Sequence, residues 1–217
     1  MNEMELIARK EIFPHWIIYA LMFSIAVLSI LKYQREYVFV NLRMTFFKSP
    51  SSVSFSKEEI KFFGSTNWVL LINYFLVTTL AMYMVLIYHE ISNNWLMLLP
   101  IVYYAFQILA MFFVGVLSGE LKRLRENILL LNFTSHFIGL LFIPILFAWI
   151  LNPGLSPYLF NSLIVLFSAL HLLRILRGVF IALRNKVLWY YIILYLCALE
   201  IWPVLTVYLI VSPAFIE

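Results

Sequence analysis

Long apolar runs dominate the chain, and short polar or basic stretches separate them. A helix needs roughly 20 mostly apolar residues to cross the hydrocarbon core of a bilayer. The runs are continuous, whereas the strands of a membrane barrel alternate apolar and polar positions. The pattern therefore predicts an all-α polytopic membrane bundle in one domain, with six transmembrane helices at residues 14–31, 68–88, 95–116, 128–151, 158–173 and 187–211.

Basic residues gather in alternate connections between these runs. Thirteen of the 15 Lys and Arg residues fall in the long loop 32–67, in 117–127 and in 174–186. In a chain with six spans, these three connections lie on the same side of the membrane. Cytoplasmic connections are enriched in Lys and Arg, so we expect this side to be cytoplasmic. Both termini are then expected on the periplasmic side.

The composition agrees with a membrane protein and excludes a soluble one. Hydrophobic residues make up 64% and charged residues 12%, against roughly 45–50% and 25% in soluble domains. The net charge of +4 fits loops that face anionic lipid better than a nucleic-acid partner. The single cysteine, Cys197, excludes an internal disulfide and a thiolate metal cluster.

Glu200 is the most informative polar residue inside a predicted span. A rise of about 1.5 Å per residue puts it about 20 Å from the cytoplasmic start of that span, close to the bilayer midplane. A carboxylate there costs roughly 2.5–3.5 kcal/mol, so it should face protein or water, or carry a proton. Gln107 and Thr78 or Thr79 reach a similar depth, and we expect a midplane cluster with Glu200. A proton or substrate site and a purely structural contact both stay open.

A second candidate group consists of basic side chains near the predicted cytoplasmic boundary. His171, Arg174 and Arg177 are spaced at i, i+3 and i+6, so they share one helical stripe. Arginine offers a planar fork that suits phosphate, and with Arg184 these residues are candidates to contact an anionic lipid head group or an acidic partner. His136 lies at comparable depth and is a candidate to join His171. The alternative is ordinary positive charge on the cytoplasmic side.

The chain lacks the patterns of known catalytic sites. It has no aspartate, and it contains no HExxH, GxSxG, phosphate-loop or CxxC motif. Membrane enzymes that act on phosphorylated lipids hold Mg²⁺ with clustered acids, and two histidines alone fall short of the ligand set of zinc. We therefore expect no enzymatic activity, no metal and no cofactor.

The C-terminal third holds an unusual sequence. The stripe from His171 to Arg177 is followed by Leu-Tyr195-Leu-Cys197-Ala-Leu-Glu200-Ile-Trp-Pro203. This region resembles an uncharacterised Bacteroidota family of integral membrane proteins, a domain of unknown function. The resemblance implies an inner-membrane location in a Gram-negative bacterium. It supplies no reaction and no ligand, and it singles out as motif positions His171, Arg174, Arg177, Tyr195, Cys197, Glu200 and Pro203.

These observations leave three functional hypotheses. The first is a non-catalytic subunit or scaffold of a larger envelope assembly, for example one serving protein export or envelope biogenesis, with other integral membrane proteins as partners. The second is a small proton-linked transporter or channel that uses Glu200. The third is a lipid-binding or lipid-modifying membrane protein with its site at His171 and the arginines.

Overall fold

The computed structural model describes residues 13–34, 65–118 and 121–184. Five of the six predicted spans fall on helices there, and the sixth, 187–211, lies outside the described residues, as does nearly all of the 32–67 loop. The helical segments are, in chain order, α1 (Trp16–Gln34), α3 (Ser65–Tyr88), the 3₁₀ segment η1 (Asn94–Leu98), α4 (Leu99–Ser118), α5 (Leu121–Leu151), the 3₁₀ segment η2 (Pro153–Leu155) and α6 (Ser156–Arg184).

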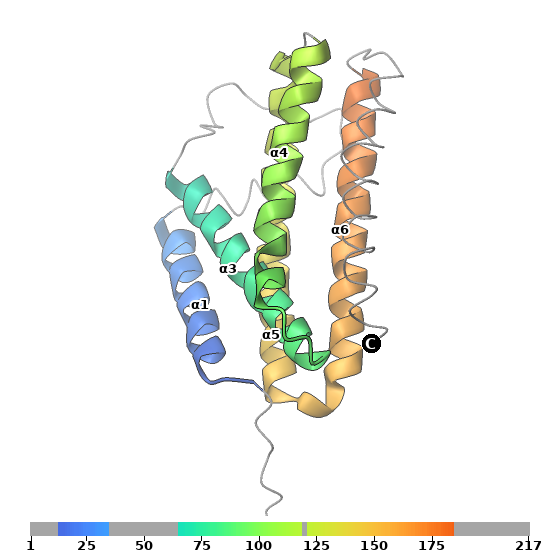
Figure 1. Ribbon diagram of the computed structural model, residues 1–217. Coiled ribbons are helices and arrows are strands. Elements are labelled where there is room, and N and C mark those ends of the chain that lie inside the picture. Colours follow the sequence, from blue (N-terminus) through green and yellow to red (C-terminus); the bar gives the residue numbers. More distant parts are fainter. Residues whose placement is uncertain (1–12, 35–64, 119–120, 185–217) are drawn as a thin grey trace, which may run out of the picture.

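The helices run alternately up and down along one common direction (Figure 1). Helices α1, α4 and α6 end, and α3 and α5 begin, at the same end of the bundle, which lies at the top of Figure 1. We call this end the basic end, because the first turns of α5 and the last turns of α6 carry Lys122, Arg123, Arg125, Arg177 and Arg184.

Length and composition suit a membrane. Within the described residues, four helical stretches are long and apolar enough to cross a bilayer, at Asn67–Tyr88, Trp95–Phe113, Asn127–Leu151 and Pro153–Phe180. Trp16–Leu31 is a shorter apolar helix. The all-helical architecture is therefore confirmed for the described residues, several of whose helices are long and apolar enough to span a membrane. The count of six spans and the periplasmic side of the termini stay predictions.

Two of the predicted basic connections are largely helical instead. The expected loop 117–127 shrinks, because α4 continues to Ser118 and α5 already begins at Leu121. The expected connection 174–186 is wrong in its first part, because α6 continues to Arg184. Lys and Arg are good helix formers, so a charge that ends an apolar window does not end a helix. Helices α5 and α6 therefore reach 31 and 29 residues.

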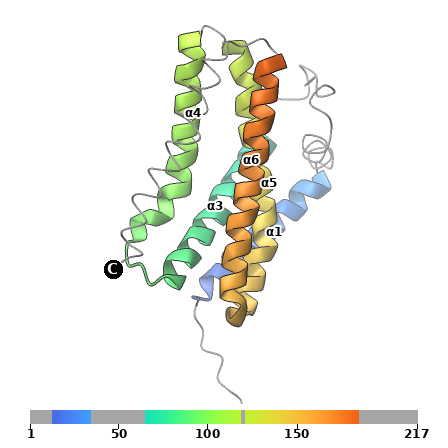
Figure 2. The ribbon, with the colours of Figure 1, turned by 90° about the vertical axis from the view of Figure 1, so that its right-hand side faces the viewer.

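Helices α3 and α5 form the centre of the bundle. Half or more of the apolar stretch of each is buried, 56% for α3 and 50% for α5, against only 17% for α4 and for α6. The core between them is filled by large side chains such as Met84, Leu146 and Trp149, all fully buried. The 90° view in Figure 2 shows α4 standing at one side of this centre, so α4 and α6 present most of their surface outward.

A short link joins α3 to η1 at the end opposite the basic end. The amide of Ile91 donates to the Leu86 carbonyl at 2.9 Å, and the amide of Glu90 donates to the Ile87 carbonyl at 3.1 Å. This is the Schellman pattern of helix termination, whose residue after the cap adopts the left-handed conformation. Glu90 takes that role with a φ of 58°, although glycine is the usual residue there.

Candidate functional site

A buried charge joins α4 to α6. The guanidinium Nη1 of Arg174 donates to Oε1 of Gln107 at 3.1 Å, and the two side chains are only 3% and 1% exposed. A guanidinium keeps its proton in proteins, so this is a permanent positive charge inside a helix bundle. Charges at membrane depth are rare, costly and held by specific contacts. Arg174 is therefore the strongest candidate for a specific role.

One turn away, the same two helices make a second polar contact. The Tyr103 hydroxyl and His171 Nε2 lie 3.2 Å apart and share a hydrogen bond. The His171 ring also stacks on Phe167, with the ring centres 5.8 Å apart and the planes within 12°. These contacts fix the imidazole on the face of α6 that looks toward α4.

The neighbouring helices α3 and α5 contribute further polar groups. The buried Tyr104 hydroxyl donates to the Asn132 side-chain carbonyl of α5, and Tyr74 of α3 lies next to Ser135. Arg174 is close enough to act electrostatically on both tyrosines. Four helices thus meet at one polar cluster, which consists of Tyr74, Tyr103, Tyr104, Gln107, Asn132, His171 and Arg174.

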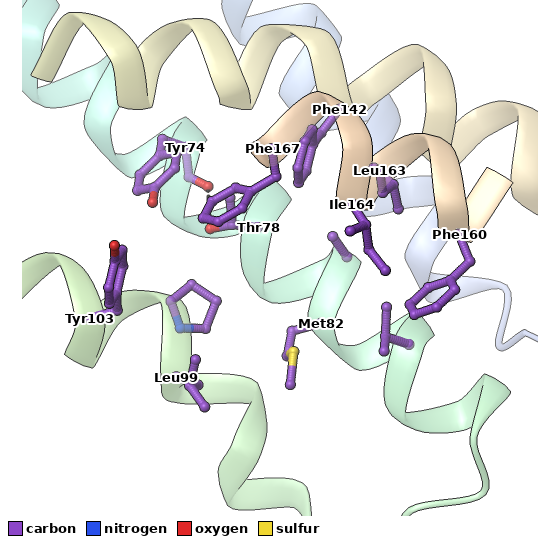
Figure 3. Close-up of a pocket in the computed structure, with 13 residues that line it drawn as sticks. Tyr74, Thr78, Met82, Leu99, Tyr103, Phe142, Phe160, Leu163, Ile164 and Phe167 are labelled. Atoms are coloured by element: carbon purple, nitrogen blue, oxygen red, sulfur yellow. Dashed lines mark hydrogen bonds between the residues drawn. The ribbon is translucent and has the colours of Figure 1, made fainter. Parts of the chain in front are cut away.

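An apolar pocket lies beside the polar cluster and is bordered by α3, α4, α5 and α6 (Figure 3). Its volume is about 290 Å³. Tyr74, Thr78 and Tyr103 gather at one end, and Phe160 lies toward the other end. The rest of the lining is hydrocarbon or aromatic, so this pocket, which we call the lateral groove, suits an apolar occupant.

The structure gives partial information on the predicted midplane cluster. Gln107 is buried, and Arg174 is its hydrogen-bond partner among the described residues. The Thr78 hydroxyl donates within its own helix to the Tyr74 carbonyl at 2.8 Å, while Thr79 is half-buried on the same helix. Glu200, and with it the motif positions Tyr195, Cys197 and Pro203, lies outside the described residues.

The predicted basic stripe is divided by the structure. Arg174 points into the bundle, Arg177 is half-buried one turn further on, and Arg184 is the last residue of α6. His136 is 2% exposed and packs edge-on against Phe133, with ring centres 6.4 Å apart. Its neighbours thus differ from those of His171. Among the described residues, no group of three or more His, Cys, Asp or Glu side chains could hold a metal ion.

Several polar partners were not singled out from the sequence. Tyr103, Tyr104 and Asn132 complete the polar cluster, and Ser24 of α1 donates to the Asn73 side chain of α3 at 2.5 Å. Their common signal is a polar group inside an apolar run. Hydrogen bonds between helices are the usual way to satisfy such groups in membranes, so each of them marks a helix contact.

Comparison with known protein families identifies the family of this chain. The family described as Domain of unknown function (DUF4271) matches residues 17–211. The chain belongs to the DUF4271 family. No curated protein and no solved structure matches this DUF4271 chain. Membership agrees with the expected uncharacterised family and covers every described helix, so the polar cluster lies within the DUF4271 domain.

Proposed function

We propose that this DUF4271 protein is a non-catalytic subunit or scaffold of a larger envelope assembly, and that the outer face of α6 binds a transmembrane helix of another membrane protein. We further propose that the basic end faces the cytoplasm, since cytoplasmic ends of membrane proteins are rich in Lys and Arg. The proposal rests on the engagement of the buried polar groups and on the surface of α6.

The buried polar groups mostly bond to one another across helix contacts. Ser24 bonds to Asn73 and joins α1 to α3, and Tyr104 bonds to Asn132 and joins α4 to α5. The pairs Gln107–Arg174 and Tyr103–His171 join α4 to α6. Each pair fixes the relative position of two helices, and interhelical hydrogen bonds contribute roughly 0.6–2 kcal/mol in membranes. Such a network supports a scaffold role.

The outer face of α6 carries a regular apolar seam. Its members are separated by seven, seven, four and seven residues, the spacing of the contact positions in a two-helix coiled coil. With 3.6 residues per turn, they lie opposite Phe167 and Arg174. Each side chain is 47–74% exposed. This outer seam consists of Tyr158, Val165, Leu172, Leu176 and Leu183.

The single observation that carries the proposal is the length of this seam. Helix α6 has 29 residues, about 43 Å at 1.5 Å per residue, whereas the hydrocarbon core is about 30 Å thick. The seam continues to Leu183, past the end of the membrane-compatible stretch at Phe180. In an upright α6, a hydrocarbon core of about 30 Å leaves part of the seam uncovered. A partner helix that follows α6 beyond the bilayer surface covers it.

Site-specific photocrosslinking at native expression level tests the proposal. A photoreactive side chain replaces Leu172, and a matched one replaces Tyr19 on the exposed face of α1, where it is 73% exposed. We expect a protein adduct of one defined mass from position 172 and lipid adducts alone from position 19. The double variant Leu176→Ala with Leu183→Ala should reduce the protein adduct several-fold, and Met22→Ala with Phe23→Ala should leave it unchanged.

Two outcomes would contradict the proposal. The first is lipid labelling alone from both positions. The second is a protein adduct at position 172 whose yield is unchanged by the double variant Leu176→Ala with Leu183→Ala. Such an adduct would come from random collisions rather than from binding at the seam. Reporter fusions at either terminus test the orientation separately, and a cytosolic terminus would refute it.

A further inference from the structure

The lateral groove and the outer seam lie on opposite sides of α6. Phe160, Leu163, Ile164 and Phe167 of α6 line the groove, and Arg174 points to the same side, about two turns beyond Phe167. The groove is open rather than enclosed, since Ile164 in its lining is still 47% exposed. An apolar element can therefore lie along the groove and reach the polar cluster at its end.

We propose that residues 187–211 of this chain occupy the lateral groove and bring Glu200 to Arg174 and His171. The segment follows Arg184, the last residue of α6, after two residues, so it begins beside the helix that lines the groove. It is 25 residues long and contains one charged residue, Glu200. As a helix it is about 37 Å long, enough to cross the bilayer and to cover the groove.

The register of the two segments brings opposite charges to one level. Arg174 and His171 lie ten and 13 residues before Arg184, which is about 15 Å and 20 Å along α6. In an antiparallel helix that starts at Val187, Glu200 lies 13 residues on, which is about 20 Å. Glu200 is then level with His171 and within roughly one turn of Arg174. The long side chain of arginine can cover this distance.

Charge complementarity between Glu200 and Arg174 favours this register. Glu200 is a carboxylate inside an apolar run, and a protein partner of opposite charge is one of the ways to accommodate such a group at membrane depth. Arg174 supplies a permanent positive charge that is buried on the groove side of α6, and Arg and carboxylate form the strongest charge-assisted hydrogen bonds. The outer seam offers no such charge, because Tyr158, Val165, Leu172, Leu176 and Leu183 are all uncharged. The inference does not depend on the proposed partner of that seam.

Cysteine crosslinking in the full-length protein tests the position of the segment. On a Cys197→Ala background, Phe167→Cys is paired with a cysteine at one of four successive positions at the same level, Val204, Leu205, Thr206 or Val207. A disulfide requires Cα atoms within about 7 Å, and four successive positions cover one whole turn. Val165→Cys on the outer seam, paired with the same four, is the control.

We expect at least one pair with Phe167→Cys to crosslink within a single chain, and none with Val165→Cys. Crosslinks from Val165→Cys alone would place the segment on the other face and overturn the proposal. Absence of crosslinks from either position, together with labelling of Phe167 by a photoreactive phospholipid, would assign the groove to lipid and overturn it as well.

A double-mutant cycle tests the charge pair. Arg174→Gln and Glu200→Gln should each lower the thermal unfolding midpoint in lipid nanodiscs by several degrees. The double variant should fall no further than the worse single variant, because residues in direct contact are not additive. Additive losses would show that the two charges do not meet. Should a single variant fail to accumulate, the crosslinks still decide the position of the segment.

Discussion

Gly139 of α5 lies directly against the backbone of Tyr74 of α3. A Cβ atom at position 139 would be 3.0 Å from the Tyr74 Cα and 3.3 Å from its Cβ, closer than ordinary carbon contacts. The glycine thus lets the two central helices approach, and small residues have this role in membrane helix pairs generally. The same contact holds Tyr74 at the edge of the polar cluster and the lateral groove.

Gly139→Ala should destabilise the bundle. Forcing a methyl group against a rigid backbone costs about 1–3 kcal/mol, which exceeds the roughly 0.5–1 kcal/mol that alanine gains over glycine in a helix. Thermal unfolding in nanodiscs measures the net loss. Gly154→Ala is the control, because a Cβ there meets no atom within 4 Å. Equal midpoints for the two variants would disprove a tight contact.

Gln107→Leu should also destabilise the protein, because it keeps the size of the side chain and removes the acceptor of Arg174. Hydrogen bonds to charged groups contribute about 1.5–3 kcal/mol, and we expect a loss in that range. Phe106→Leu, one residue away and 40% exposed, controls for the position on α4. If both variants unfold at the same temperature, the Gln107 contact carries no net stability.

Ser24→Ala should cost about 1–3 kcal/mol, the penalty for leaving a buried acceptor without its donor. Ser24 is 1% exposed and Asn73 is 6% exposed, so bulk water cannot replace the lost donor. Ser29→Ala is the matched control on the same helix, since its hydroxyl is exposed and bonds to the Ile25 carbonyl within that helix. Equal losses in the free energy of unfolding for Ser29→Ala and Ser24→Ala would contradict the prediction.

His89 should make the bundle less stable in mild acid. Burial lowers the pKa of His89 below its ordinary value of 6.5, so the folded state resists protonation more than the unfolded state does. Stability is then unaffected above about pH 6.5 and falls as the pH drops below it. His89→Phe keeps an aromatic ring beside Tyr88 and Phe160 and should flatten the decline of the unfolding midpoint between pH 7.5 and 5.5. Tyr88→Phe should leave that decline as it is, and an unchanged slope in His89→Phe would rule His89 out as its source.

Glu90→Gly should raise the stability of the link after α3. The left-handed backbone costs a non-glycine residue roughly 1–2 kcal/mol, and glycine removes that strain while losing some entropy. We expect a gain of up to about 1 kcal/mol in the free energy of unfolding. Glu90→Ala has the same charge change without the backbone relief, so a gain of equal size in both variants would point to charge instead.

The helices follow closely from the apolar pattern, and their ends follow less well. The predicted span 128–151 and α5 share the end at Leu151, but α5 begins seven residues earlier, at Leu121. Hydropathy counts side chains, whereas a helix continues as long as its backbone bonds are favourable. Arg174 closed the predicted fifth span for the same reason, although it is buried inside α6.

The site was only partly predictable. Gln107 was predicted in a midplane cluster with Glu200, whereas Arg174 was predicted near the cytoplasmic boundary, so the sequence did not predict a contact between them. The structure puts them 3.1 Å apart. The hydroxyls of Tyr103 and Tyr104 lie inside an apolar run, but this signal is weak, because tyrosine is also common near the membrane interface. Only the packing of four helices shows that these hydroxyls meet other polar groups inside the bundle.

The unequal lengths of the helices have a consequence for the lipid around the protein. Helix α4 has 20 residues and α6 has 29, so they cannot both match one bilayer thickness while standing upright. Mismatch of this kind is relieved by tilt or by local thickening of the bilayer, at a fraction of a kcal/mol per Å. The chain length of the surrounding phospholipids therefore becomes a variable that sets the tilt of the protein.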